Sequence, residues 1–530
     1  MKRSRSAVLL ALALALVPGL TTLKALWVDA PTAGAVAQTV RSDEPAIALR
    51  ADQIKLLRDA LAQSDEQGFD DHEFFPPTLD GLLQSADPVQ RARGQDLVVA
   101  ASLRYASALH RGRLALTAFD NEWGMRPAAF DARASLLAAL QQNRLKPWLD
   151  DLAPPYLGYQ QLIAGLQTYR DIVARGGWDM VANGPSLKLG MSDPRVPALR
   201  ARLLAEYPEL AKPFADAQAQ ALAAAQAAQA AQTAAAPGGK PAPPATDPQL
   251  VFDPALDGAL KSFQARHGLD LDGVLDRTTL QAVNVPAEVR LDQIVANMER
   301  WRWVPPVLPS DRVQVNIAAA ILTLFRRDQP VLSMRAVAGR ITDHTPILQS
   351  KIHSIVFNPP WNVPTTIANK ELWPKERAHP GYLASDDFVV IHLPDGGTRL
   401  QQRAGPKSAL GQVKFDFDNN YGVYLHDTPT HSTFGRESRL VSHGCVRLEN
   451  PKALALALLQ DNPMWTAPSI DTLIMQGNTQ RASLSQPTDV LIFYWTAFAG
   501  PDGAMNFRTD SYGWDKELLQ RIAAGRPGKA

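Results

Sequence analysis

Cys445 is the only cysteine in this 530-residue sequence. No internal disulfide bond, and no zinc site made of two or more thiolates, can therefore hold the fold together. A chain of this length is too long for a single hydrophobic core, so about three domains are expected. With 46% hydrophobic and 20% charged residues the composition is that of an ordinary globular protein, and a formal net charge of +1 gives no electrostatic argument for nucleic acid as a partner.

The neighbourhood of this cysteine contains the residues that thiol chemistry requires. A thiol with an ordinary pKa of roughly 8.5 attacks carbonyl groups as the thiolate, so a nucleophilic cysteine needs a base or a positive potential nearby. His426 follows an apolar run, residues 423–425, that predicts a strand, and Cys445 is expected to open a neighbouring strand. The thiol and the imidazole are then expected to face each other.

The residues on either side of Cys445 fit the same chemistry. Gly444 has no side chain, so the backbone can approach a substrate closely, and the N–H groups of Gly444 and Cys445 can form an oxyanion hole. In an extended segment Arg447 projects to the same face as Cys445, where it can hold a substrate carboxylate or stabilise the thiolate.

Two other interpretations fit the residue types alone. A lone cysteine is more often a small buried apolar side chain than a nucleophile. His426, His431, His443 and Cys445 also supply four side chains of the kind that binds zinc, although only His443 and Cys445 are closely spaced. Composition alone leaves these alternatives open.

The order of the residues in this region is more specific than their types. Residues 424–429 (Tyr-Leu-His-Asp-Thr-Pro) and 442–447 (Ser-His-Gly-Cys-Val-Arg) resemble the signature of L,D-transpeptidases of the YkuD type, cysteine enzymes that cross-link bacterial peptidoglycan. Residues 358–364, 405–411, 414–415 and 494–498 extend the resemblance to the larger branch of that family, in which a helical scaffold and a wall-binding module precede the catalytic domain.

The resemblance implies a role for each residue of the site. Cys445 is the implied nucleophile and His426 its base, with no metal and no cofactor. Gly444 and the Tyr424 hydroxyl are implied at the oxyanion. The remaining residues implied beside the substrate are Arg447, His443, Ser442, Trp361 and Asn362.

The implied reaction is formation of a 3→3 cross-link. A tetrapeptide stem of peptidoglycan loses its terminal D-alanine to give a cysteinyl thioester, which an amine of a neighbouring stem then attacks. Stem peptides and glycan are the implied partners, with an envelope protein as another possible acceptor. Two alternatives remain: water as acceptor, which makes the protein an L,D-carboxypeptidase or endopeptidase, and a non-catalytic wall-binding scaffold.

The expected fold class is a multidomain α+β protein. The N-terminal residues 1–40 read as a signal peptide or an inner-membrane anchor, because Lys2, Arg3 and Arg5 precede an apolar run, so an exported protein of the periplasm or cell envelope is expected. A helical scaffold is expected over 41–183. A three-helix peptidoglycan-binding-like domain is expected over 184–288, interrupted by an Ala/Gln/Pro-rich linker at 211–248. A mainly-β catalytic domain follows over 305–515, with a cap insertion at about 363–416, and 516–530 is expected to be a C-terminal tail.

Local patterns add expectations for individual elements. Asp96 is expected to cap a helix that ends at Gly112, and Pro451 to start another. Runs of apolar and β-branched residues predict strands. These strands cover residues 313–317, 321–325, 331–337, 352–357, 389–393, 423–426, 470–475 and 490–495.

Overall fold

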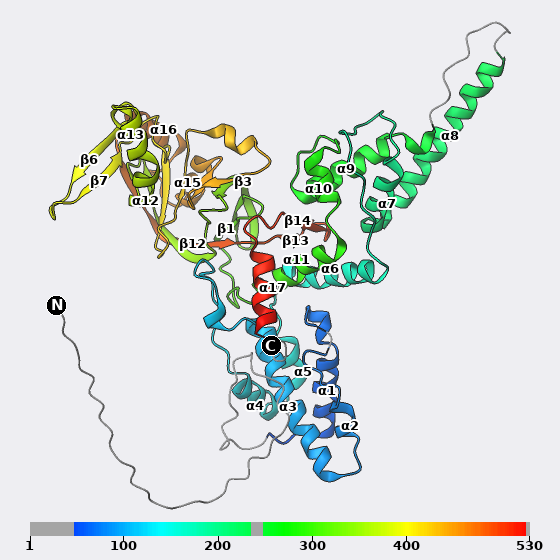
Figure 1. Ribbon diagram of the computed structural model, residues 1–530. Coiled ribbons are helices and arrows are strands. Elements are labelled where there is room, and N and C mark those ends of the chain that lie inside the picture. The colour runs from blue at the N-terminus through cyan, green and yellow to red at the C-terminus, as the bar shows by residue number, and fades with distance from the viewer. Residues whose placement is uncertain (1–46, 71, 235–246, 526–530) are drawn as a thin grey trace, which may run out of the picture.

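The computed structural model describes residues 47–70, 72–234 and 247–525 (Figure 1). These residues form a large central hydrophobic core and three smaller ones. The expected N-terminal export segment, the Pro/Gly-rich part of the linker and residues 526–530 lie outside the described residues. Within the described ranges, no helix has the length and apolar character needed to cross a membrane.

The first helices of the chain form the scaffold, which lies below the other parts in Figure 1. Its helices share one core and are α1 (Ala51–Ala62), α2 (Leu79–Leu83), α3 (Pro88–Arg111), α4 (Ala132–Gln141) and α5 (Leu145–Asp150). Helix α3 ends at Gly112, as expected, where φ is +86°. The expected cap at Asp96 is wrong: Asp87 caps the helix by accepting a hydrogen bond from the Val89 N–H, and Pro88 occupies the first turn.

A second helical module surrounds its own core and lies beside the catalytic domain in Figure 1. Its helices are α7 (Val196–Glu206), α8 (Ala211–Ala234), α9 (Pro254–His267) and α10 (Arg277–Val283). Asp276 caps α10, as expected, and Asp253 caps α9. The Ala/Gln-rich half of the linker is helix α8, in keeping with the helix propensity of those residues.

The catalytic part is built on a nine-stranded sheet of order β10-β3-β11-β9-β8-β4-β12-β1-β2. β2 also pairs with β3, so the sheet closes on itself. Its strands are β1 (Arg312–Asn316), β2 (Ile321–Arg326), β3 (Gln329–Gly339), β4 (Leu348–Phe357), β8 (Val413–Phe417), β9 (Leu425–His426), β10 (Leu440–Ser442), β11 (Val446–Leu448) and β12 (Gln480–Phe493).

Helices from both ends of the chain pack into the same central core as this sheet. They are α6 (Leu157–Ala174), α11 (Ala287–Trp301), α15 (Pro451–Leu458), α16 (Ala467–Gln476) and α17 (Trp514–Ala524), together with the hairpin of β13 (Ala497–Ala499) and β14 (Met505–Phe507). In Figure 1, α6, α11 and α17 lie where the three parts of the molecule meet.

Two expectations for this region are wrong. The β-branched residues of 470–475 lie in helix α16, because Thr466 and Ser469 form a capping box at its start and Gly477 ends it with φ +73°. The expected tail after 515 continues helix α17 as far as Ala524, because Leu518 and Ile522 recur at helical spacing and are buried in the central core.

The expected cap insertion forms a small unit with its own core. Its elements are β5 (Trp361–Asn362), α12 (Thr365–Ile367), the π-helical turn η5 (Ala368–Leu372), α13 (Trp373–Ala378), α14 (Tyr382–Ser385), β6 (Phe388–His392) and β7 (Thr398–Gln402). The three strands form a separate sheet of order β5-β7-β6, and the β6–β7 hairpin projects from the edge of the molecule (Figure 1). Since β8 belongs to the main sheet, the cap ends before Val413 rather than at 416.

Candidate active site

Three adjacent strands place the candidate catalytic residues on one face of the sheet. His426 of β9 lies opposite Lys414 of β8 and opposite Arg447 of β11. Leu425 and Val446 also lie opposite each other, and both are fully buried in the central core. Because side chains alternate along a strand, His426 and Arg447 project from the other face, as do Tyr424 and Cys445, which precede them by two residues.

Cys445 lies immediately before β11, beside Tyr424. The Val446 N–H donates to the Tyr424 carbonyl at 3.0 Å, and the sulfur interacts with both the backbone and the hydroxyl of Tyr424. Burial raises the pKa of the Cys445 thiol, and it outweighs Tyr424, Lys414 and Arg447, which act to lower that pKa. The resting thiol is therefore neutral at neutral pH, and the positive potential expected from the sequence does not by itself ionise it.

His426 is buried, and its Nδ1 lies 2.5 Å from the Asp427 carbonyl oxygen. A carbonyl can only accept a hydrogen bond, so this contact favours a proton on Nδ1, and the ring also hydrogen-bonds to the Leu410 carbonyl. Burial first, and then the charge of Arg447, lower the pKa of His426 to about 3. The imidazole is therefore neutral, as a general base must be before it accepts a proton.

The thiol and the imidazole are diagonal neighbours on adjacent strands. Ideal strand spacing separates the Cα atoms of such a pair by roughly 8 Å, a distance that two side chains projecting from the same face can shorten. The structure thus places a neutral Cys445 and a neutral His426 on one face. Two neutral groups do not form a resting thiolate–imidazolium pair.

Arg447 and Lys414 are cations that act on both Cys445 and His426, and their surroundings differ. The Lys414 ammonium forms an ion pair with Asp416 at 2.8 Å and lies 4.3 Å from the centre of the Tyr424 ring. Arg447 has a buried Nε without a hydrogen-bond partner, and burial lowers its pKa while Cys445 raises it. Arg447 is therefore the cation with capacity left for an anionic ligand.

The loop before the thiol is fixed by its own hydrogen bonds. The Ser442 hydroxyl donates to the Cys445 carbonyl at 2.6 Å and accepts from the Gly444 N–H at 3.1 Å. Gly444 has φ +108°, a conformation that side chains rarely adopt, and its carbonyl accepts from the Thr345 hydroxyl at 2.7 Å. The Gly444 N–H, one of the two expected oxyanion donors, already has a partner in this structure.

Glu371 and Trp361 are among the cap residues that contact the site. His443 Nε2 lies 2.6 Å from Glu371 Oε1 of the cap, and Arg340 reaches the same carboxylate at 3.4 Å. Trp361 packs into the cap core and also hydrogen-bonds to the Tyr424 hydroxyl. The side chain of Asn362 accepts from Gln401 Nε2 at 2.8 Å within the cap sheet.

The described residues contain no group of three or more His, Cys, Asp or Glu placed to hold a metal ion. His443 is engaged by Glu371, while His431 lies 3.8 Å from Asp427. These contacts give no support to the zinc interpretation of the sequence.

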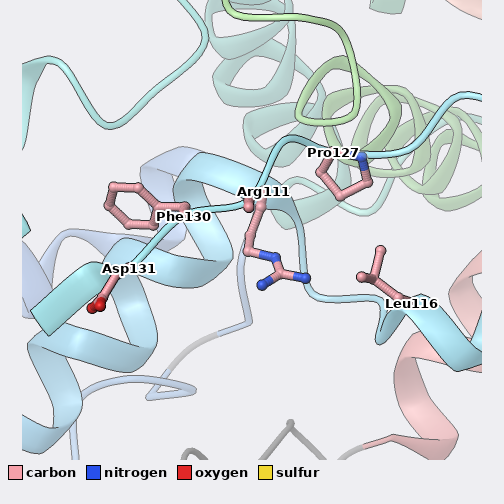
Figure 2. A pocket seen from close by; sticks show the side chains of 6 residues that line it. Arg111, Leu116, Pro127, Phe130 and Asp131 are labelled. Carbon is pink, nitrogen blue, oxygen red and sulfur yellow. The ribbon is translucent and has the colours of Figure 1, made fainter.

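The scaffold contains a hollow of about 580 Å³ (Figure 2). The residues that line it are Arg111, Leu116, Pro127, Ala129, Phe130 and Asp131. This lining offers neither a thiol nor an imidazole, so the hollow adds nothing to the chemistry of Cys445.

Sequence reasoning gave no role in the site to Lys414, Thr345 or Glu371, although each contacts a site residue. The alternation of Lys414 and Asp416 across Phe415 could have placed Lys414 on the polar face of its strand. Thr345 and Glu371 lie 99 and 72 positions from their partners, Gly444 and His443, and no local pattern points to such contacts.

Three family models match parts of the sequence. Residues 310–463 match the family model of the L,D-transpeptidase catalytic domain, YkuD. Residues 41–166 match the model of the Scaffold domain, and residues 239–283 match a model described as "Putative peptidoglycan binding domain".

One curated relative and several solved structures are similar to this chain. A "Putative L,D-transpeptidase" of Haemophilus influenzae is 31% identical over 242 residues, which are 43% of this chain and 48% of the relative, so the chain spans about half the length of the relative it matches. An L,D-transpeptidase from Mycobacterium smegmatis is 16% identical, with a TM-score of 0.19, over 34% of this chain and 58% of that chain.

The catalytic domain of an Enterococcus faecium L,D-transpeptidase, acylated by ertapenem, is 14% identical, with a TM-score of 0.18, over 35% of this chain and 99% of that chain. At TM-scores this low, neither structure carries an argument about the site. The family models and the curated relative, however, identify the modules of the sequence. Residues 310–463 thus match the catalytic domain of the YkuD-type L,D-transpeptidases, and other parts of the chain match a scaffold domain and a putative peptidoglycan-binding domain.

Proposed function

We propose that this protein is an L,D-transpeptidase that forms 3→3 cross-links in peptidoglycan through a thioester on Cys445. The observation that carries the proposal is the single sheet face on which Cys445, His426 and Arg447 lie together. The face supplies a nucleophile, a base and a cation without a carboxylate partner, the groups that an acyl transfer from an anionic peptide requires.

The first half of the reaction transfers an acyl group to the enzyme. As the Cys445 sulfur attacks the carbonyl that precedes the terminal D-alanine of a tetrapeptide stem, His426 Nε2 takes the thiol proton. The oxyanion is stabilised by a backbone N–H and by the Tyr424 hydroxyl, while Arg447 holds a carboxylate of the stem. When the C–N bond breaks, the imidazolium gives its proton to the departing amine of D-alanine, and a thioester remains.

The second half of the reaction transfers the acyl group to the acceptor and regenerates the Cys445 thiol. A side-chain amine of a neighbouring stem attacks the thioester carbonyl, His426 takes a proton from that amine, and the new amide forms as sulfur departs and is protonated. The neutral resting states of Cys445 and His426 suit this cycle. The thiol proton leaves with D-alanine in the first half, and a proton from the acceptor amine replaces it in the second.

The other modules suggest where the reaction takes place. The match of residues 239–283 to a peptidoglycan-binding model supports peptidoglycan as the partner, and the family points to an exported cell-envelope enzyme. The N-terminal segment proposed to direct export lies outside the described residues.

The proposal is tested with purified protein and tetrapeptide muropeptides. Cross-linked dimers and free D-alanine are expected with the wild type and neither product with Cys445→Ala. Trimmed monomers without dimers indicate water as the acceptor, and a protein without any turnover that still binds the wall is a scaffold. Either result contradicts the proposal. Supplying an envelope protein as the amine donor shows whether a protein also serves as acceptor.

A further inference from the structure

We propose that Thr345 is a positioning residue that fixes the peptide between Gly444 and Cys445, so that the Cys445 N–H points to the oxyanion. The inference rests on the proposed acyl transfer only in requiring that Cys445 attacks a carbonyl. It assigns a function to a buried hydroxyl far from the nucleophile in the sequence.

The first step of the argument concerns which N–H groups of the loop are available. The Gly444 N–H donates to the Ser442 hydroxyl at 3.1 Å. No acceptor for the Cys445 N–H is found in the part of the chain that the structure describes. Of the two donors expected from the sequence, the Cys445 N–H is therefore the one left for a developing oxyanion.

The second step concerns the plane of that N–H. The Gly444 carbonyl and the Cys445 N–H belong to one peptide unit, which is planar, and in a trans peptide they point in opposite directions. The Thr345 hydroxyl donates to the Gly444 carbonyl at 2.7 Å. Holding the oxygen therefore also sets the direction of the N–H, and a hydrogen bond to the carbonyl strengthens the N–H as a donor.

The third step shows that Thr345 is itself held from two sides. Its hydroxyl accepts from the Gly339 N–H at 2.8 Å, and its backbone N–H donates to the Tyr512 hydroxyl at 3.2 Å. Tyr512 in turn donates to the Gly339 carbonyl at 2.6 Å. Thr345 is fully buried, so an alternative hydrogen bond to water is excluded for its hydroxyl.

The position of Gly339 explains why this arrangement is tight. Gly339 ends β3, and the catalytic loop passes from β10 to β11 across that end, because both strands pair with β3. A Cβ atom at Gly339 would lie 2.2 Å from the Asp343 carbonyl oxygen and 2.6 Å from the Thr345 nitrogen. The turn that carries Thr345 therefore lies directly against the end of β3, beneath the loop.

The scaffold domain supports the same turn. Glu122 Oε2 lies 2.6 Å from His344 Nδ1, and the Glu122 carbonyl accepts from the Ile347 N–H at 2.8 Å. The Gly124 N–H donates to the Ile347 carbonyl at 2.7 Å. The scaffold thus contacts the chain on both sides of Thr345, which links it to the site.

The test compares two reactions of the same sulfur. Acylation by p-nitrophenyl acetate passes through an oxyanion, whereas alkylation by iodoacetamide does not. Neither reaction needs a wall peptide, so failure of the proposed cross-linking activity leaves this test intact. Because Cys445 is the only cysteine, intact mass corrected for the adducts that Cys445→Ala forms at its amines reports both reactions of this sulfur.

Thr345→Val is expected to lower the acylation rate about tenfold, the effect of one hydrogen bond, and to leave the alkylation rate unchanged. Thr345→Ser, which keeps the hydroxyl, restores acylation. Thr342→Val is the matched control, since Thr342 lies in the same turn but bonds only to Asp343 at 2.9 Å, and it is expected to behave as the wild type.

Two results overturn the inference. In one, Thr345→Val is acylated as fast as the wild type. In the other, acylation and alkylation fall together, or Thr345→Ser fails to restore the rate although it folds, and the residue then only supports the fold. Tyr512→Phe provides a second variant if Thr345→Val does not fold, and the same selective loss of acylation is expected for it.

Discussion

A fully buried cluster of charged side chains and the half-buried Arg447 are arranged in opposite ways in this molecule. Where the scaffold meets the catalytic part, Glu299 accepts from the Arg113 N–H at 2.6 Å and from Arg302 Nη1 at 2.9 Å, and the side chains of Glu299 and Arg302 are both 0% exposed. On the catalytic face, Arg447 has no carboxylate partner among the residues that the structure describes. Paired charges join domains, whereas an unpaired charge marks a place prepared for a ligand.

The difference teaches which charges can be changed without unfolding the protein. Removing one partner of a buried pair leaves the other uncompensated, so the cost falls on stability. Removing a charge that has no partner relieves a desolvation cost. Stability is then kept, and the rate of the reaction falls. The predictions below test this division, beginning with the largest effect.

Glu299→Gln is expected to lower the free energy of unfolding by about 3–5 kcal/mol, because the Arg302 and Arg113 guanidinium groups lose their shared carboxylate. Denaturant unfolding measures the change. The acylation rate of the folded fraction is expected to stay at the wild-type value. A loss of stability below about 1 kcal/mol would show that this group does not join the domains.

Arg447→Met is expected to reduce acylation of Cys445 about 100-fold, because it removes the cation beside the reacting sulfur, and to leave the free energy of unfolding unchanged or higher. Arg447 lowers the pKa of the thiol, so its loss raises that pKa further. The alkylation rate, followed from about pH 6 to about pH 10, then rises at higher pH than in the wild type.

The pH dependence of the alkylation rate of the wild type also distinguishes a neutral Cys445–His426 pair from a thiolate–imidazolium pair. Burial raises the Cys445 pKa, so the thiol stays protonated at neutral pH and alkylation accelerates only above the ordinary thiol pKa. A rate that is already high and flat around neutral pH would contradict the neutral pair, since a thiolate–imidazolium pair behaves in that way.

Glu449→Gln is the smallest expected effect and the matched control for Glu299→Gln. Glu449 pairs with Arg335 at the surface, where the two side chains are 31% and 50% exposed. The same chemical change is expected to cost less than about 1 kcal/mol, since water replaces the partner. A cost comparable to that of Glu299→Gln would remove burial as the cause of the difference.

Much of the catalytic domain could be predicted from local pattern. Strands such as residues 321–325 and 352–357 can be predicted because their side chains alternate or form short buried runs between turns. The motif around Cys445 indicates the resemblance to the transpeptidase family. Residues 470–475 were wrongly predicted as a strand, because their β-branched side chains were given more weight than the helix-capping signals of Thr466 and Gly477. The helical spacing of Leu518 and Ile522 does predict the helix after residue 515.

The rest of the site depends on contacts that no local pattern contains. Thr345 and Gly444 meet only because β3, β10 and β11 pair in one sheet. Glu371 meets His443 only because the cap folds back over the loop. The pKa values of Cys445 and His426 follow from burial, which residue types do not report.

The most direct measurement is intact mass spectrometry of the wild type mixed with a tetrapeptide donor and no acceptor. A thioester adduct equal to the donor without its D-alanine is expected on Cys445, absent from Cys445→Ala and strongly reduced in His426→Gln. A wild type that folds, reacts with iodoacetamide and yet forms no adduct, or an adduct that persists in Cys445→Ala, would contradict the account.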